Sequence, residues 1–215
     1  MLLTVPMGPL EANCYILSRG EGCDAAVIDP SDAGTAMQAL LKFRLRPTHI
    51  LLTHGHFDHI AGAGELKSLR GCAVLIHSLD AKCLSDPDEC RAAWMGGELV
   101  PSEPTRLVAD GETVSAAGYT FSVLHTPGHT PGGVCYVCEE QKLAFTGDTV
   151  FLEGVGRTDL PGGNMRELMR SVCDRVLALP KDFTLYPGHG DPTTVAHERE
   201  HNPLLPYRRN PWFNS

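Results

Sequence analysis

The stretch Thr53-His54-Gly55-His56-Phe57-Asp58-His59-Ile60-Ala61-Gly62 contains three histidines and one aspartate and directly follows an apolar run. Side chains two positions apart point in different directions on a helix, so this set does not share one helical face. The side chains can instead converge from a tight loop at a strand end. Structural zinc sites draw on cysteine and close their coordination sphere, whereas histidines with a carboxylate favour a hard or borderline metal that keeps a position open for water. The stretch therefore predicts a metal site with room for a bound water.

Three later positions stand in the same context, because each follows an apolar strand and lies inside a glycine-rich turn. They are His129 before Thr130-Pro131-Gly132, Asp148 after Thr146-Gly147, and His189 in Pro187-Gly188-His189-Gly190. Strand ends gathered at one edge of a sheet bring such side chains together, and the adjacent glycines allow close approach of the backbone. We expect these three residues to complete the site.

Hydrophobic periodicity outlines the first half of the chain as strands near 2–5, 12–17, 25–28, 48–52 and 73–76, with helices near 33–45 and 60–71. The second half gives strands near 120–124, 134–137, 143–145 and 183–186, a helix near 165–177 and another from 195. This order predicts an α+β fold in which two sheets pack face to face with helices outside, in two similar halves.

Residues 85–105 form the least regular segment, with three prolines and a glycine pair. A loop of this length in a compact domain is usually functional or mobile. The segment 88–95 is compatible with a short helix that carries Trp94 and Met95. Packing of both side chains on the core is the preferred interpretation, and a lid over the metal cleft is the alternative.

Composition bounds the domain organisation and the partners. A chain of 215 residues with 42% hydrophobic residues is long enough for one well-buried core and short for two, so we expect a single domain over residues 1–215. The formal net charge of -8 provides no broad basic surface for nucleic acid or an anionic membrane, and no run is long and apolar enough to span a bilayer. We expect a small-molecule partner.

The cysteines and the N-terminus predict a cytoplasmic protein. No segment resembles a signal peptide, and the eight cysteines then read as reduced thiols. Cys135 and Cys138 form a CxxC pair on a predicted strand, where residues three apart point to opposite faces. We expect buried thiols rather than a redox or metal pair.

The blocks around 53–59, His129, Asp148 and His189 resemble the signature blocks of the metallo-β-lactamase superfamily, and the resemblance covers almost the whole chain. It implies a four-layer αββα sandwich with two divalent metal ions, Zn being the expected metal and Fe or Mn the alternatives. The implied ligands of the first metal are His54, His56 and His129, those of the second are Asp58, His59 and His189, and Asp148 bridges the two.

The implied chemistry is hydrolysis. Two dications ~3.5–4 Å apart ionise a shared water near neutral pH, so a metal-bridging hydroxide serves as the nucleophile and no serine or cysteine is needed. Asp58 is the candidate catalytic residue, because it would orient that hydroxide as well as bind metal.

Within the superfamily, residues 154–163 and the closing stretch His197-Glu198-Arg199-Glu200-His201-Asn202-Pro203 resemble the short, single-domain glyoxalase II-like hydrolases, which cleave hydroxyacyl thioesters. A thiolate with a pKa of about 8.5 leaves without a strong general acid, so a thioester suits such a site. Arg157 is a candidate substrate residue, although an ion pair with Asp159 that holds the loop is its preferred role.

The chain departs from the two-domain glyoxalase II, whose C-terminal helical domain binds glutathione. The chain ends shortly after His189, so we expect no separate glutathione-binding domain, and glutathione specificity is not implied. Arg208 and Arg209, near Tyr207 and Trp212, offer an anion grip, but a solvated basic tail is the preferred interpretation.

Several alternatives stay open at this point. A histidine at position 56 favours hydrolysis over the redox chemistry of the flavodiiron branch, which carries a carboxylate there. The stretch 156–159 also resembles a persulfide dioxygenase, which uses one iron held by two histidines and an aspartate. A non-catalytic binding module on the same fold is disfavoured because no ligand is missing.

His77 and His125 also end strands, where an ordinary hydrogen-bonded role is preferred.

Overall fold

The first half of the chain forms a six-stranded sheet in the computed structural model, which describes residues 1–205. The strands follow the sequence order β1 (Leu2–Met7), β2 (Ala12–Ser18), β3 (Asp24–Ile28), β4 (Arg46–Leu51), β5 (Ala73–His77) and β6 (Arg106–Val108). The pairs from β1 to β3 are antiparallel and those from β3 to β6 are parallel. Parallel strands therefore direct their carboxyl ends to one edge of this sheet.

The second half forms another six-stranded sheet, in the order β14-β13-β10-β9-β8-β7. Its strands are β7 (Thr113–Ala116), β8 (Tyr119–His125), β9 (Val134–Cys138), β10 (Leu143–Gly147), β13 (Thr184–Pro187) and β14 (Thr193–Thr194). Only β10 and β13 pair in parallel. A small hairpin of β11 (Val150–Phe151) and β12 (Gly154–Val155) stands apart from both sheets.

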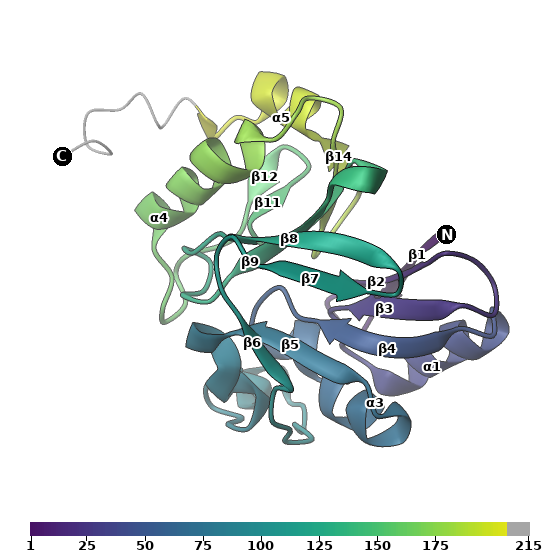
Figure 1. Cartoon of the computed structure of the whole chain (residues 1–215). Coiled ribbons are helices and arrows are strands. Elements are labelled where there is room, and N and C mark those ends of the chain that lie inside the picture. The colour runs from purple at the N-terminus through teal and green to yellow at the C-terminus, as the bar shows by residue number, and fades with distance from the viewer. Residues whose placement is uncertain (206–215) are drawn as a thin grey trace.

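Helices cover the outer face of each sheet (Figure 1). Helices α1 (Ala33–Lys42) and α3 (Ala63–Arg70) pack on the first sheet, and α4 (Met165–Arg170) and α5 (Val195–His201) pack on the second. Three apolar cores separate the four layers. Leu40 and Leu66 lie in the first core, Tyr15 and Phe145 lie between the sheets, and Leu168 lies in the third core. The predicted αββα sandwich with two similar halves is confirmed.

Two predicted helices are interrupted. The helix expected near 60–71 divides into α2 (Phe57–Ile60) and α3, because the Gly62 N–H donates to Pro30 O (2.9 Å) instead of continuing the helix. The helix expected near 165–177 begins as α4, with Asn164 as its cap, and continues as a π-helical turn (Ser171–Arg175) and a 3-10 turn (Val176–Ala178). Leu168, Val172 and Val176 of that segment are buried.

The irregular segment contains no α-helix near 88–95, which is a correction. A 3-10 helix spans Ser78–Leu84, and a single 3-10 turn spans Ala92–Met95. Only Ala92 of that turn is buried, and Trp94 is 72% exposed. The expectation that Trp94 packs on the core is therefore wrong, because one short turn buries one face only.

The cysteines lie as expected. Cys135 and Cys138 are both buried thiols. Cys135 belongs to the core beneath α4 and α5, whereas Cys138 belongs to the core between the sheets, so the pair points to opposite faces of β9. Among the described residues, no helix has the length and apolar character needed to cross a membrane. The candidate anion grip at 207–212 lies outside the described residues.

Candidate metal centre

The sequence-predicted ligands meet at one edge of the sandwich. His54 and His56 follow β4, while Asp58 and His59 belong to the short helix α2. The remaining three follow β8, β10 and β13 in the second sheet, and they are His129, Asp148 and His189. Each sheet therefore contributes part of the site, and the parallel strand ends explain why.

His54, His56 and His129 form the first group, in which each offers one ring nitrogen and these atoms lie within 4.8 Å of one another. Nδ1 of His56 lies 2.8 Å from Nε2 of His129. Nε2 of His54 is buried and has no hydrogen-bond partner. Three imidazole nitrogens that converge on one point suit a borderline dication.

Asp58, His59 and His189 form the second group, also within 4.8 Å. Oδ2 of Asp58 lies 3.3 Å from Nε2 of His189 and 3.7 Å from Nε2 of His59. The His59 side chain is fully buried, and its Nε2 has no hydrogen-bond partner.

Asp148 lies between the two groups. Its Oδ1 is 3.4 Å from Nε2 of His59, and its Oδ2 is 3.4 Å from Nε2 of His129. Oδ1 is also buried without a hydrogen bond. One carboxylate therefore faces both groups with a separate oxygen, as a bridging ligand must.

Hydrogen bonds donated by Nδ1 orient four of the five histidines. The Nδ1 atoms of His129 and His189 lie 2.8 Å from Arg157 O and 3.1 Å from Leu10 O. Nδ1 of His54 lies 3.1 Å from the Thr53 hydroxyl oxygen. Donation from Nδ1 leaves the lone pair on Nε2, which faces the site in each case.

Asp29 orients the fourth histidine, a role that sequence reasoning missed. Oδ2 of Asp29 lies 3.0 Å from Nδ1 of His59 and accepts from the Thr53 hydroxyl (2.6 Å), and Oδ1 accepts from Thr53 N (2.7 Å). Asp29 also lies within 4.8 Å of His54 and His59 ligand atoms. Both of its oxygens are already occupied by donors, so we assign it to the outer shell rather than to a metal. Its only sequence signal is its position at the end of β3.

Asp80 ties the two ligand loops together and was also missed. This buried carboxylate accepts from Gly55 N (2.9 Å), the Thr130 hydroxyl (2.7 Å) and Gly132 N (2.7 Å). It therefore fixes the loop that carries His54 and His56 against the loop that carries His129.

Replacement of Asp80 by alanine should lower the free energy of unfolding by about 3 kcal/mol, because three buried donors lose their acceptor. Urea unfolding followed by circular dichroism measures this change. Asp182→Ala is the matched control, since Asp182 forms an exposed ion pair with Lys142 and its loss should change stability little. Equal stability of the Asp80 variant and the wild type would contradict this role.

The electrostatics of the two groups differ. Burial lowers the pKa of His54 well below its ordinary value, and burial together with His129 lowers the pKa of His56 to about 3. Burial also opposes protonation of His59, but Asp148, Asp29 and Asp58 outweigh it and raise the pKa to about 10. His54 and His56 thus offer neutral imidazoles, and the carboxylates around the second group attract positive charge.

The backbone approaches the ligands closely at Gly188. A Cβ atom at this position would lie 2.2 Å from Oδ1 of Asp148 and 2.6 Å from Cε1 of His59. The glycine is therefore required by space, as the glycine-rich turn around His189 predicts. Nε2 of His54, Nε2 of His59 and Oδ1 of Asp148 are buried without a hydrogen-bond partner, and the histidine lone pairs face the site. Together with the space left by Gly188, these features fit bound metal ions.

A pocket of about 690 Å³ opens above the site. Its metal-facing wall contains His56, Asp58, His129, Asp148 and His189. The rest is largely apolar and is formed by Pro9, Leu10, Cys90, Trp94, Met95, Phe151, Val155 and Leu160, with Arg91 and Arg157 as the cationic members. This volume is in the range of small-molecule sites.

Arg157 forms the expected ion pair. Its Nε and Nη2 atoms donate to the two carboxylate oxygens of Asp159, both at 2.7 Å. Its carbonyl also accepts from His129, so the loop supports a ligand through its backbone. His77 and His125 are hydrogen-bonded, as preferred, and their rings stack with centroids 4.3 Å apart. Neither belongs to a ligand group.

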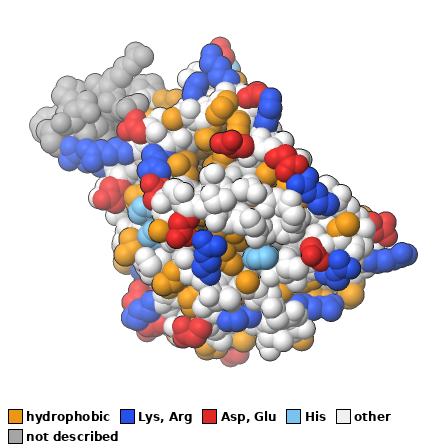
Figure 2. Space-filling model, in the orientation of Figure 1, with side chains coloured by type: hydrophobic (Ala, Val, Ile, Leu, Met, Phe, Trp, Pro, Cys, Tyr) orange, Lys and Arg blue, Asp and Glu red, His pale blue; other side chains and the backbone are white. Residues whose placement is uncertain are grey.

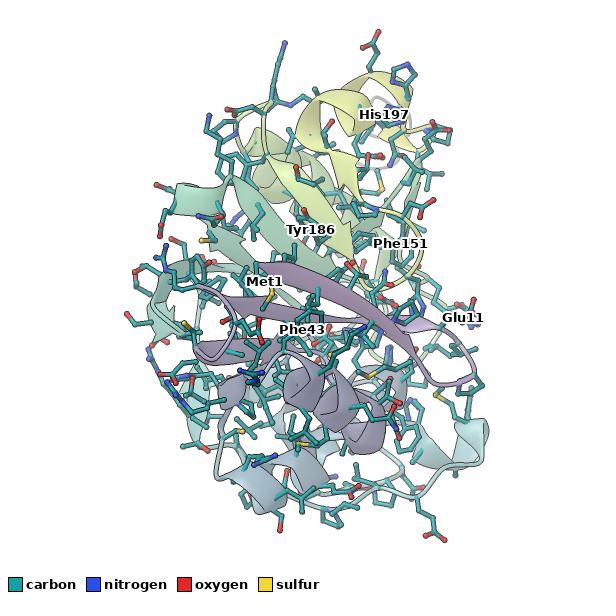
Figure 3. All side chains as sticks on the ribbon, turned by 90° about the vertical axis from the view of Figure 1, so that its right-hand side faces the viewer. Met1, Glu11, Phe43, Phe151, Tyr186 and His197 are labelled. Atoms are coloured by element: carbon teal, nitrogen blue, oxygen red, sulfur yellow. The ribbon has the colours of Figure 1, made fainter. Side chains whose placement is uncertain are left out.

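The closing sequence motif positions the β11–β12 hairpin. The buried Glu198 carboxylate accepts from Glu153 N (3.1 Å), the Thr193 hydroxyl (2.6 Å) and Asn202 Nδ2 (2.8 Å). Asn202 also donates to Gly154 O (3.1 Å). Figure 3 shows Phe151 of this hairpin and His197 of α5 in the same upper half of the molecule. The motif therefore holds the hairpin whose Phe151 and Val155 line the pocket.

Comparison with known proteins matches the metallo-beta-lactamase superfamily to residues 7–189. The chain belongs to this superfamily. Hydroxyacylglutathione hydrolase GloC of Haemophilus influenzae is 35% identical over 94% of this chain and 96% of its own length. Family membership and the histidine and aspartate site make the protein a metal-dependent hydrolase of this superfamily.

Two solved structures of the superfamily resemble the chain over nearly its full length. BLEG-1, described as a B3 metallo-beta-lactamase, has a TM-score of 0.90 and 35% identity, covering 95% of this chain and 99% of its own. TTHA1623, solved in a di-iron-bound form, has a TM-score of 0.83 and 38% identity, covering 94% and 100%. The superfamily resemblance found from the sequence is confirmed.

Proposed function

We propose that this protein hydrolyses thioesters of small hydroxy acids with two divalent metal ions. The observation that carries the proposal is the convergence of seven ligand residues in two groups joined by Asp148, five of which line the 690 Å³ pocket. His54, His56 and His129 would hold one metal, and Asp58, His59 and His189 the other. Zinc is the proposed metal, with iron or manganese as alternatives.

Two metals held by these residues would supply an ionised water near neutral pH and would act as Lewis acids toward the substrate carbonyl. Asp58 faces the pocket with a partly exposed carboxylate, where it accepts a hydrogen bond from the attacking water and aims it at the carbonyl. Asp29, through His59, and Asp80, through the two ligand loops, keep the donors in place.

The pocket wall suits a thioester. The carbonyl carbon of the thioester must reach the predicted metal ligands that line the pocket. The sulfur and its carrier then lie against the apolar wall made by Phe151, Val155 and Leu160. A thiolate leaves at neutral pH without protonation by a strong acid, and the described wall provides none. The similarity to GloC supports the same reaction class.

A small-molecule partner in the cytoplasm completes the proposal. The positive and negative side chains are interspersed on the face in Figure 2, where no broad basic area gathers. That distribution does not suit nucleic acid, whose binding depends on clustered Lys and Arg.

The test is a substrate screen with protein purified without added metal. We expect hydrolysis of S-lactoylglutathione or S-lactoyl-N-acetylcysteamine, its loss after chelation, and its recovery with Zn²⁺, Fe²⁺ or Mn²⁺. Turnover of a β-lactam without turnover of either thioester would replace the proposal with the activity in the BLEG-1 description. Oxygen uptake with a persulfide, and no hydrolysis, would establish the dioxygenase alternative.

A further inference from the structure

We propose that Arg91 binds a carboxylate of the substrate, remote from the thioester, so that the preferred substrates are acidic thioesters. This inference rests on the proposed thioester hydrolysis, because it states the charge of the molecule that enters the same pocket. Among the described residues lining the pocket, only Arg91 and Arg157 carry a fixed positive charge.

The two arginines differ in how their charge is compensated. Arg157 forms a bidentate pair with Asp159, so a substrate carboxylate would have to compete with an existing one. Arg91 forms no ion pair with a carboxylate of residues 1–205, and it donates only to backbone carbonyls, those of Asp88 (Nη1, 3.0 Å) and Pro161 (Nη2, 3.3 Å). Its full charge therefore remains available.

Nearby acids do not neutralise Arg91. Glu89 and Asp80 line an adjoining pocket of about 200 Å³ together with Arg91. The Glu89 carboxylate pairs with Lys82 (2.8 Å), and the Asp80 carboxylate accepts from Gly55 N, the Thr130 hydroxyl and Gly132 N. Asp58 and Asp148 face the histidines of the metal site. The chain as a whole is acidic, with a net charge of -8, and so does not attract anions in general. The unpaired positive charge of Arg91 is the feature that favours an anion at this pocket.

The guanidinium is held in place with donors to spare. An arginine has five N–H donors, of which two are used by the carbonyls of Asp88 and Pro161. Nε of Arg91 is buried and has no hydrogen-bond partner. The Nη1 and Nη2 hydrogens that these carbonyls do not use can donate to a substrate carboxylate, which accepts parallel bonds from a guanidinium.

The backbone does not account for an arginine at this position. Arg91 has a φ of 69°, a left-handed conformation that favours glycine or asparagine. The contact with Pro161 joins segment 87–95 to the loop that carries Arg157, so the side chain spans the two walls of the pocket. Its neighbours Trp94 and Met95 add apolar surface for the carbon skeleton of the substrate.

The carboxylate can belong to the thiol half or to the acyl half of the substrate, and stable thioethers distinguish these sources. One pair is S-(2-hydroxypropyl)glutathione and its diethyl ester, which differ in charge on the thiol half. The other pair is S-(5-carboxypentyl)-N-acetylcysteamine and its methyl ester, which differ on the acyl half. Calorimetric titration of the metal-loaded protein gives Kd for each, independently of hydrolysis.

We expect the wild type to bind the charged member of one pair about 10- to 100-fold more tightly than its ester, as for a charged hydrogen bond. Arg91→Gln should lose that preference and Arg91→Lys should keep part of it. Arg157→Gln, the matched control at the paired arginine, should keep the preference. Because each value is a ratio within one protein, a general loss of folding does not imitate the result.

No preference for either charged thioether in the wild type, or an unchanged preference in Arg91→Gln, would overturn the assignment. A preference lost in Arg91→Gln supports it, whichever half carries the carboxylate. The thioester screen is read separately: binding with the expected charge preference, but no hydrolysis of any thioester, would refute the proposed reaction and leave the carboxylate site standing.

Discussion

Replacement of Asp58 by asparagine is expected to lower kcat/KM for thioester hydrolysis by about 10²- to 10³-fold. Asparagine keeps the size of the side chain but removes the charge that faces His59 and His189 at 3.7 and 3.3 Å. The variant loses a charged metal ligand and the acceptor that aims the attacking water. Initial rates with saturating metal measure the effect, so that weak metal binding is separated from poor catalysis.

Asp182→Asn provides the control for this variant, because it removes a carboxylate that pairs with Lys142 on the surface. Its activity should equal that of the wild type. If Asp58→Asn retains wild-type turnover under metal saturation, Asp58 does not act in the reaction, and the protein would be better described as a binding module on this fold.

Asp29→Asn should lower the affinity for one of the two metals by about 10- to 100-fold, the usual cost of removing an outer-shell partner. The buried Asp29 carboxylate accepts three hydrogen bonds and fixes the tautomer of His59, whereas an amide offers one acceptor oxygen. The other metal, held by His54, His56 and His129, should be affected less. Competition with a chromophoric chelator resolves the two dissociation constants.

Asp32→Asn is the matched control for Asp29→Asn. Asp32 caps α1 by accepting from Thr35 N (2.6 Å), and asparagine is an equally good cap residue. Metal binding should be unchanged in this variant. Identical affinities at both sites in Asp29→Asn would show that His59 needs no help from Asp29.

The layers and the seven donors were predictable because their signals are local. An apolar run followed by glycine and histidine or aspartate marks a strand end, and this signal recurs at His54, His129, Asp148 and His189. Parallel pairing of β3 to β6 and of β10 with β13 then brings these ends to one edge. The local sequence pattern and the strand topology therefore both predict that these ligands lie together.

The supporting residues were not predictable, because their roles depend on contacts distant in sequence. Asp29 bonds Thr53, which lies 24 residues away, and Asp80 bonds Gly132, which lies 52 residues away. In the sequence, each is a single aspartate near a strand end, which reads as a turn residue. Arg91 lies in the irregular segment, where no periodicity shows which side chains face the pocket.

The exposed position of Trp94 has the same origin. A segment with three prolines and two adjacent glycines carries no helical periodicity. The predicted burial of Trp94 therefore rested only on the general tendency of tryptophan to be buried. The structure instead leaves one 3-10 turn and places Trp94 and Met95 at the pocket. A lid role for this turn, the alternative interpretation, remains a prediction.

The count of metal ions per chain tests the central claim most directly. Elemental analysis by mass spectrometry, on protein purified without added metal and again after saturation and desalting, gives this number. The proposed centre predicts two ions per chain after saturation, held by two groups that share Asp148. A stoichiometry that stays at one ion per chain would contradict the two-metal site and favour the mononuclear iron alternative.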